Sequence, residues 1–333
     1  MTGPVSSSKQ RGVALIMVLL AMALIVMLAT GMTKHQSVRV YKAGHYLAQN
    51  QGYSIALGAE AFAKQILFRD FEEDKENNLF VDSPDEFWAR YSALLPLDEG
   101  VVEIQVDDLG GRINLNDLVD SSGLVNEVTR DRLERLFIVL GLTNLNVNVL
   151  VDWIDANEET VNAYGAEDGQ YLMQDPPYRA ANQPFQSVTE LRLLEGITEE
   201  EYQALAPHVA ALPVAGLGIN VNMASGPVLQ ALHAELTEAQ IKSVLLQRQE
   251  GRFENIQNFL ALPEFAGLGL KPQGLGLQTR FFEVASRITY DDRSVNLVST
   301  VFRSPTGELS TVGRDTGQKN RITKERFGVS EGS

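Results

Sequence analysis

Residues 13–32 read VALIMVLLAMALIVMLATGM, an uncharged apolar stretch that follows directly on Lys9-Gln10-Arg11-Gly12. A helix rises about 1.5 Å per residue, so this stretch would cover about 30 Å, the thickness of the hydrocarbon core of a bilayer. A secretory signal peptide has a shorter apolar core followed by a cleavage site of small residues, and Ala29-Thr30-Gly31 is only a weak version of such a site. The length of the stretch therefore predicts a membrane anchor.

The segment after the anchor predicts a continuation of the same helix. From Thr33 to about Phe71 there is no proline, and the glycines are isolated. Apolar residues recur there at steps of three and four positions, which is the period of an amphipathic helix. They are Val40, Ala43, Leu47, Ala48, Ile55, Ala59, Phe62, Ala63 and Ile66. We therefore expect one long helix that is apolar all round in its first third and amphipathic in the remainder.

The composition predicts a folded, acidic protein. The chain has 333 residues, of which 44% are apolar. This is enough for a body of roughly one to three domains. Its net charge of -15, which becomes -17 without Lys9 and Arg11, argues against nucleic acid as a partner. Because cysteine is absent, stability must come from packing or from a bound metal rather than from disulfides.

Three segments predict the strands of one antiparallel sheet. Residues 101–106 alternate apolar and polar side chains, and residues 281–290 and 295–303 are joined by a tight turn at residues 291–294. The intervening residues 114–272 read mainly as helices. Since an isolated pair of strands is seldom stable, we expect an α+β fold. In this fold the long N-terminal transmembrane helix packs on a small antiparallel sheet, and a large all-α domain is inserted between the strands.

This reading divides the chain into six segments. They are a basic leader at residues 1–12, the transmembrane part of the helix at 13–32, the rest of the helix and the first strands at 33–112, the inserted helical domain or domains at 113–274, the remaining strands at 275–312 and a tail at 313–333. The tail is polar and lacks apolar periodicity, so we expect it to be disordered. Residues 70–78 predict a charged loop, and residues 83–95 predict a short helix capped by Ser83. Helices of the inserted block are predicted at residues 130–141, 147–156, 188–194, 198–212, 224–232, 237–249 and 256–262.

The inserted block contains two pairs of similar segments. Ile113-Asn114-Leu115-Asn116 and Ile219-Asn220-Val221-Asn222 each introduce a helical run. In the same way, the segment that begins at Phe185 resembles the segment that begins at Phe253. These similarities predict duplicated small helical modules.

The candidate metal site is the loop between Asp152 and Asp175. Oxygen-bearing side chains alternate in its first part, and further carboxylates follow within reach of a folded loop. The candidate ligands are Asp155, Asn157, Glu159, Glu167, Asp168 and Asp175. The pattern fails the EF-hand rule, because Thr160 replaces the glycine of position six and Ala166 stands at position twelve. Spacing alone leaves two interpretations open, a solvated acidic loop and a calcium site of another kind.

The sequence contains none of the common enzyme signatures. It has no phosphate-binding loop, no Gly-x-Ser-x-Gly elbow and no His-Glu-x-x-His helix, and its four histidines form no ligand pair. We therefore predict that the chain is not an enzyme.

The junction at Gly12 and Val13 resembles the type IV pilin and type II secretion pseudopilin class, whose short basic leader ends in glycine before an uncharged helix. Within that class the chain is similar to the K-type minor pseudopilins, the general secretion pathway protein K family. The matching motifs are Gly110-Gly111-Arg112-Ile113-Asn114-Leu115-Asn116, Asp152-Trp153-Ile154-Asp155, Tyr164-Gly165-Ala166-Glu167-Asp168, Pro177-Tyr178-Arg179 and Asn220-Val221-Asn222.

The resemblance implies processing by a prepilin peptidase between Gly12 and Val13, with methylation of the new amino terminus. Members of the class usually carry glutamate at the fifth mature position, where it pairs with the amino group of a neighbouring subunit, and here this position is Met17. An unpaired charge in hydrocarbon costs several kcal/mol, so a subunit without this carboxylate is suited to the end of a filament.

The resemblance also implies partners, a place in the cell and a metal. The partners are the other minor pseudopilins, the major pseudopilin, the prepilin peptidase and the inner-membrane assembly platform. The chain would cross the inner membrane once, with its amino terminus in the cytoplasm and its bulk in the periplasm. It would cap a periplasmic pseudopilus that exports folded proteins, and it would bind calcium at the acidic loop.

Two alternative interpretations of the function remain open. One is a signal-anchored periplasmic calcium-binding protein or enzyme whose helix serves only as a tether, and the other is a minor pilin of a type IV pilus. Cleavage after Gly12 would support the hypothesis of a filament subunit. An intact leader or a cut after Gly31 would support a periplasmic protein that the helix only tethers to the membrane.

Overall fold

The computed structural model describes residues 11–98, 100–120, 122–290, 293–318 and 321–327. The chain forms two compact units, residues 1–55 and residues 56–333. The helix α1 (Arg11–Asn77) supplies the described part of the first unit and opens the second. The predicted long helix is therefore confirmed, while most of the predicted leader lies outside the described residues.

The helix α1 ends later than the sequence predicts. Residues 70–77 were expected to form a charged loop, but they are helical. A high density of charge does not break a helix when glycine and proline are absent. The helix ends where Asn78 adopts a φ of 51° and the Leu79 amide donates to the Asp74 carbonyl at 3.0 Å. Such a left-handed residue is a common helix terminator.

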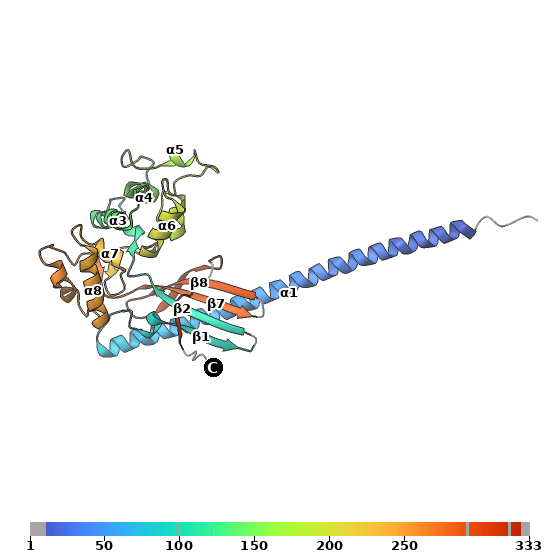
Figure 1. Ribbon diagram of the computed structural model, residues 1–333, viewed down its shortest axis with the longest axis horizontal. Helices are drawn as coiled ribbons and strands as arrows, with labels where there is room; N and C mark the ends of the chain where they lie inside the picture. Colours follow the sequence, from blue (N-terminus) through green and yellow to red (C-terminus); the bar gives the residue numbers. More distant parts are fainter. Residues whose placement is uncertain (1–10, 99, 121, 291–292, 319–320, 328–333) are drawn as a thin grey trace, which may run out of the picture. The chain divides into compact units, whose positions relative to one another are not determined.

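A six-stranded sheet forms the base of the second unit (Figure 1). The strand order is β10-β1-β2-β7-β8-β9. The strands are β1 (Tyr91–Leu97), β2 (Gly100–Asp108), β7 (Phe281–Tyr290), β8 (Arg293–Arg303), β9 (Leu309–Asp315) and β10 (Glu325–Phe327). All neighbours are antiparallel except β10, which runs parallel to β1. The three predicted strands are β2, β7 and β8, and part of the predicted turn between the last two, residues 291–292, lies outside the described residues.

The last turns of α1 cover one face of this sheet. Ala56, Ala59, Ala63 and Leu67 are buried along one side of the helix. Glu60, on the same helix, accepts hydrogen bonds from Ser299 on β8 and from Thr311 on β9, at 2.7 Å and 2.5 Å. Burial opposes ionisation of Glu60, but the hydrogen bonds from Arg314, Thr311 and Ser299 prevail and lower the pKa of its carboxyl group.

Two expectations about local structure are wrong. Residues 83–95 were predicted as a helix capped by Ser83, but only α2 (Phe87–Arg90) is helical, and β1 follows at once. Pairing with β2, in which Ala93 lies opposite Ile104, overrides the local helical signal. The tail was expected to be disordered, but β9 extends to Asp315, and Glu325–Phe327 form β10. Residues 319–320 and 328–333 of the tail lie outside the described residues.

The segment between β2 and β7 is mainly helical, as predicted. Its helices are η1 (Leu115–Asp117), α3 (Glu127–Leu140), α4 (Val147–Ile154), α5 (Asp168–Tyr171), η2 (Val188–Leu193), α6 (Glu199–Leu205), η3 (Ala206–His208), α7 (Gly226–Gln230), α8 (Glu238–Glu250), α9 (Ile256–Leu260) and η4 (Pro263–Phe265). The helix predicted over residues 198–212 is shorter, because Pro207 interrupts it and Val209–Ala210 form strand β4.

The two similar segments that begin at Ile113 and Ile219 occupy equivalent places in the structure. The strand β3 (Ile113–Asn114) pairs in parallel with β4, which follows the first set of helices. The strand β5 (Ile219–Asn220) pairs in parallel with β6 (Leu275–Gly276), which follows the second set. Each set is thus closed by a short parallel pair, and one hydrophobic core runs through both, including Leu133, Leu150, Val228 and Phe259.

Candidate functional site

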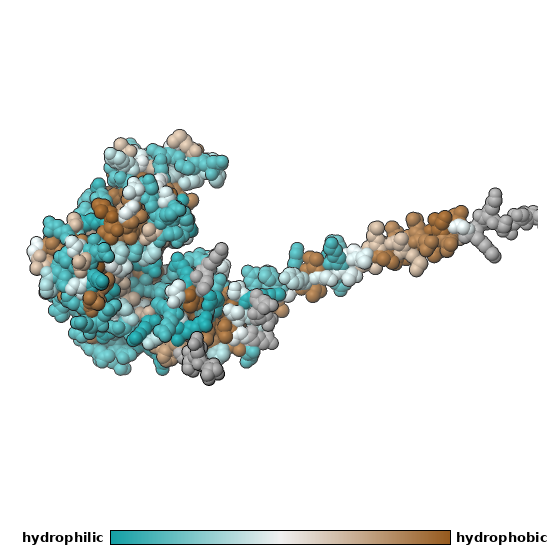
Figure 2. All heavy atoms as spheres, in the orientation of Figure 1, coloured by the Kyte–Doolittle hydropathy of each residue, from teal (hydrophilic) through white to brown (hydrophobic). Residues whose placement is uncertain are grey.

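The apolar start of α1 is the first candidate site. The helix has a mean hydropathy of 3.0 over its most apolar window, and that window is not buried against the rest of the described chain. Figure 2 shows apolar side chains gathered along this part of the helix. By length and composition it can cross a membrane, which agrees with the predicted anchor.

The predicted processing residues lie at the beginning of this helix. Gly12 and Val13 are both helical, and nothing lies within 4 Å of a Cβ placed on Gly12. Met17 follows one turn later with 63% of its surface exposed. The structure places these residues on an accessible helix, and cleavage between Gly12 and Val13 stays a prediction.

The acidic loop begins with two carboxylates on one helix. Asp152 lies in α4, and Asp155 caps its C-terminal end, so their spacing of three residues places both on the same face. Both side chains are buried, with exposed fractions of 0% and 5%. Oδ1 of Asp152 accepts a hydrogen bond from the Val161 amide at 2.9 Å, which folds the loop back onto α4.

The loop returns to Asp152 a second time at Gly165. A Cβ placed on Gly165 would lie 1.9 Å from Oδ2 of Asp152, so only glycine fits at this point. Glu167 then enters the same group and is 5% exposed. Oδ2 of Asp152 and both carboxylate oxygens of Glu167 are buried without a hydrogen-bond partner among the described residues. Burial, together with the negative charges of Asp152 and Asp155, raises the pKa of Glu167 to about 7.

Three buried carboxylate oxygens without partners are part of the donor set that a hard cation requires. Calcium takes six to eight oxygen ligands. Buried carboxylates that lack both hydrogen bonds and a cation are costly, so the chemistry of this loop fits calcium. The carboxylates are close enough for their charges to shift one another's pKa values. In the described part of the chain, however, they do not form a set of three within 4.8 Å of one another.

The other predicted ligands have different surroundings. Oδ2 of Asp168 forms an ion pair with Arg179 at 2.7 Å, and its Oδ1 accepts from the Ala180 amide. Asn157 and Glu159 are exposed, and Oδ1 of Asn157 accepts from the Glu159 amide at 2.7 Å. Asp175 is also exposed. The structure thus brings together Asp155 and Glu167 of the predicted set, and it adds Asp152.

A second residue that the sequence did not single out is Asn182. Its side-chain nitrogen donates to the Asn157 carbonyl at 3.2 Å, which fixes it beside the loop, and its Oδ1 is buried without a partner among the described residues. The spacing of Asp152 and Asp155 on one helix face could have identified Asp152 from the sequence. No local pattern identifies Asn182, because its position depends on how the loop folds.

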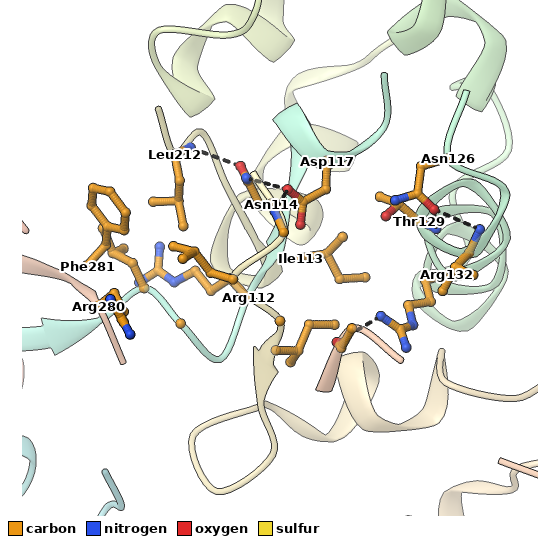
Figure 3. Close-up of a pocket in the computed structure, with 18 of the residues that line it drawn as sticks. Arg112, Ile113, Asn114, Asp117, Asn126, Thr129, Arg132, Leu212, Arg280 and Phe281 are labelled. Atoms are coloured by element: carbon orange, nitrogen blue, oxygen red, sulfur yellow. Dashed lines mark hydrogen bonds between the residues drawn. The ribbon is translucent and has the colours of Figure 1, made fainter. Parts of the chain in front are cut away.

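A cavity of about 250 Å³ lies where the two helical sets meet the sheet (Figure 3). Figure 3 shows Arg132 extending from α3 toward backbone carbonyls, and it donates to Gln273 at 2.7 Å and to Gly274 at 3.0 Å. On another wall Asn114 donates to Asp117 at 3.0 Å and accepts from the Leu212 amide at 2.9 Å. These contacts join segments that are far apart in the sequence. The residues that line the cavity include no histidine, serine or cysteine.

A second acidic group surrounds Arg303. Carboxylate oxygens of Asp70, Asp82 and Glu86 lie within 4.8 Å of one another. Arg303, which is 4% exposed, donates to Asp82 at 2.6 Å and to Asp70 at 3.2 Å. Burial is the main cause that raises the pKa of Asp70 to about 7 and that of Glu86 to about 9. Since a guanidinium already fills this cluster, we interpret it as an ion network that joins α1 to β8.

Comparison with known proteins identifies two family regions in the chain. Residues 111–214 match the first-domain model of type II secretion system protein K, and residues 219–279 match a second model with the same description. These two regions contain the two helical sets. The boundary between them separates the β3–β4 pair from the β5–β6 pair.

Relatives in several bacteria match most of the chain. The chain is 36% identical to type II secretion system protein K of Pseudomonas aeruginosa, and the match covers 93% of each chain. It is 34% identical to the protein K of Klebsiella pneumoniae over 77% of this chain and 80% of that relative. It also resembles a chain in the crystal structure of the GspK-GspI-GspJ complex from the enterotoxigenic Escherichia coli type 2 secretion system. That likeness has a TM-score of 0.74 and 25% identity, and it covers 84% of this chain and all of the other.

Proposed function

This chain belongs to the type II secretion system protein K family, and from that premise we propose that it is a minor pseudopilin at the tip of the periplasmic pseudopilus. There it starts or limits assembly of the filament that exports folded proteins across the outer membrane. The observation that carries this proposal is the likeness to one chain of the GspK-GspI-GspJ complex over the full length of that chain. The expected partners are accordingly the two other minor pseudopilins of such a complex.

The start of α1 supports a place at the filament end. A helix that is apolar on all sides can pack among other such helices in a membrane, but Met17 offers no carboxylate to the amino group of a neighbour. A subunit placed above this one would bury an unpaired ammonium group. The helical sets between β2 and β7 add bulk that blocks further addition. The work of the chain in this proposal is assembly and not catalysis.

The proposed topology follows from membership of the family. We place the amino terminus in the cytoplasm, the apolar part of α1 in the inner membrane and the remainder in the periplasm. The prepilin peptidase then removes residues 1–12 and methylates Val13. The major pseudopilin and the inner-membrane platform are the further partners in this scheme.

Calcium is the metal that we propose for the acidic loop. Asp152, Asp155 and Glu167 would hold it, and the side-chain oxygen of Asn182 lies beside the same loop. When bound, calcium would neutralise buried carboxylates and tie the loop to α4. No disulfide can do this, because the chain has no cysteine.

Co-purification tests the proposed function. The full chain, expressed with the other minor pseudopilins of its own system and extracted in detergent, should elute with them as a stoichiometric complex. A Gly12→Val variant, which blocks processing but leaves the folded body intact, serves as a matched control for the need for a mature amino terminus. If the full chain elutes alone while the other minor pseudopilins assemble without it, the proposal is wrong.

A further inference from the structure

The C-terminal strap, residues 321–327, begins on the face of the sheet opposite to α1 and ends at the edge of the sheet as β10. Ser299 on β8 contacts α1 through Glu60, and it lies opposite Val284 of β7, which in turn lies opposite Val106 of β2. Because side chains alternate along a strand, the neighbours of these residues face the other way. That second face carries Glu103, Gln105 and Asp107 of β2 and Glu283 of β7, which we call the acidic face.

One residue of the acidic face recognises the backbone of the strap. Oε1 of Gln105 accepts hydrogen bonds from the amides of Thr323 and Lys324, at 2.7 Å and 2.8 Å. Its Nε2 donates to the carbonyl of Arg321 at 3.2 Å. A side-chain amide that pairs with an extended backbone in this way imitates a neighbouring strand. These contacts do not depend on the side chains of the bound segment.

The carboxylates of the acidic face recognise the side chains of the strap. Arg321 pairs with Glu283, Arg326 pairs with Glu103, and Lys324 lies 3.1 Å from Asp107. Each basic residue therefore meets a carboxylate along the segment, and Glu103 also pairs with Arg287 of β7, which lies opposite it. Arg321 and Arg326 remain 41% and 52% exposed, so salt in the solvent can screen their ion pairs.

The end of the strap contacts an aromatic pair and the edge of the sheet. The ring of Phe327 lies 4.9 Å from that of Phe87 and 5.6 Å from that of Tyr91. In the described part of the chain, β10 pairs with β1 over Tyr91, Ser92 and Ala93.

The contacts that the strap makes with the acidic face are polar, and the apolar Ala285 and Val298 are buried on the same side of the sheet. Glu103 and Gln105 are 3% and 2% exposed, and Glu283 is 9% exposed. When a segment covers an apolar core, its release exposes that core to water at a high cost, whereas carboxylates and amides are readily hydrated. The strap therefore resembles a bound peptide more than a structural element.

We propose that the acidic face is a peptide-binding site that the strap fills in the free chain, and that it accepts an extended basic segment of another polypeptide once the strap is displaced. The partner segment has the chemistry of the strap, with basic side chains spaced as Arg321, Lys324 and Arg326 are and an aromatic residue after the last. It lies along β1 and the acidic face, with its backbone on Gln105. This inference does not depend on the identity of the filament or on the calcium site.

Peptide binding to the full chain tests this inference. The probe is a labelled peptide with the sequence of residues 321–327, RITKERF, followed by fluorescence anisotropy. In the test variant Arg321→Glu, Lys324→Glu and Arg326→Glu release the strap. We expect the peptide to bind this variant at least about tenfold more tightly than the unchanged chain, and to lose affinity as salt rises from about 50 mM to about 500 mM. A further Glu283→Gln substitution in the same variant should weaken binding.

Two controls separate a site from general attraction between opposite charges. The variant with Lys75→Glu, Lys242→Glu and Lys271→Glu has the same net charge as the test variant but an intact strap, so it should bind the peptide no better than the unchanged chain does. A peptide with the residues of RITKERF in scrambled order should bind the test variant more weakly. Equal binding by the two variants, equal binding by the two peptides, or no binding at all would overturn the proposal.

Hydrogen exchange in the unchanged chain gives a test that needs no variant to fold. We expect the amides of Thr323 and Lys324 to exchange faster as salt is raised, while those of Ile104 and Val106 in β2 keep their protection. If the strap amides exchange as slowly as those of β2 at every salt concentration, the strap is a permanent part of the sheet and the inference is wrong.

Discussion

The side-chain amide of Asn116 forms two hydrogen bonds with the backbone of Phe185, 2.8 Å from the Phe185 amide to Oδ1 and 2.9 Å from Nδ2 to the Phe185 carbonyl. Asn222 and Phe253 form the same pair, with both distances at 2.9 Å. The two pairs occupy equivalent places in the two helical sets. Each asparagine side chain therefore pairs with a backbone as a neighbouring strand would. It fixes a distant loop to the start of its helical set.

Removing either asparagine side chain should destabilise the chain. In Asn116→Ala the buried amide and carbonyl of Phe185 lose their partners, and such groups cost about 1–3 kcal/mol each when they are left unsatisfied. We expect Asn222→Ala to have a similar effect through Phe253. Denaturant unfolding of the full chain in detergent measures this loss. Asn258→Ala, which removes an exposed asparagine side chain, serves as the control, and equal midpoints for Asn116→Ala and Asn258→Ala would contradict the role of the pair.

Calcium should raise the melting temperature of the full chain. A ligand that binds only the folded state at about 100 times its Kd stabilises that state by about 2.7 kcal/mol. We expect Asp152→Asn to remove most of this response, because Oδ2 of Asp152 is one of the buried oxygens without a partner. Glu235→Gln, at an exposed position outside the loop, should leave it unchanged. A melting temperature that does not respond to calcium or to chelation, with no calcium found by elemental analysis, would remove the site.

The same loop should make stability depend on pH in a definite direction. The pKa of Glu167 is raised to about 7 in the folded chain, above its value in an unfolded chain. Between about pH 4.5 and about pH 7 the Glu167 carboxyl is therefore more often protonated in the folded state than in the unfolded state. In the absence of calcium, its contribution to the free energy of unfolding falls as pH rises through that range. Calcium requires the ionised carboxylate, so its affinity should rise over the same range. Melting curves with and without calcium at about pH 5.5 and about pH 8 measure both effects, and equal calcium responses at the two pH values would argue against Glu167 as a ligand.

The sequence predicts the elements that depend on local periodicity and fails where distant segments decide. The continuous α1 and the pairing segments of β2, β7 and β8 follow from apolar spacing. In contrast, β1 forms because Ala93 lies opposite Ile104, and β10 forms because Gln105 and the acidic face hold the strap. The same distinction applies to the acidic loop. Asp155 and Glu167 are visible as a carboxylate pattern, whereas Asn182 reaches the loop only through its bond to the Asn157 carbonyl.

Met17→Glu should alter the positions that the subunit can occupy in a filament. The new carboxylate would offer a partner to the amino group of a neighbouring subunit, so incorporation below the tip becomes possible and filament length should change. Met17→Gln adds polarity without charge and is the matched control. Electron microscopy of overexpressed filaments measures their length, and mass spectrometry of the amino terminus shows whether each variant is still cut after Gly12. Unchanged filament length in a correctly processed Met17→Glu variant would contradict the role given to this position.

Arg303→Met should destabilise the chain most strongly at high pH. The substitution leaves Asp82 and Asp70 buried without their guanidinium partner, and breaking a buried ion pair in this way costs about 3–5 kcal/mol. Burial already raises the pKa of Asp70 to about 7 and that of Glu86 to about 9. Loss of the positive charge raises them further, so the folded state of the variant holds more protons than the unfolded state, and its stability should recover as pH falls toward about 5. Arg130→Met breaks partly exposed ion pairs, with Glu127 and Glu134, and should cost less than about 1 kcal/mol at either pH. Unfolding curves of the two variants at about pH 5 and about pH 8 make the comparison, and a loss in Arg303→Met that is the same at both values would show that the carboxylates around it do not titrate with folding.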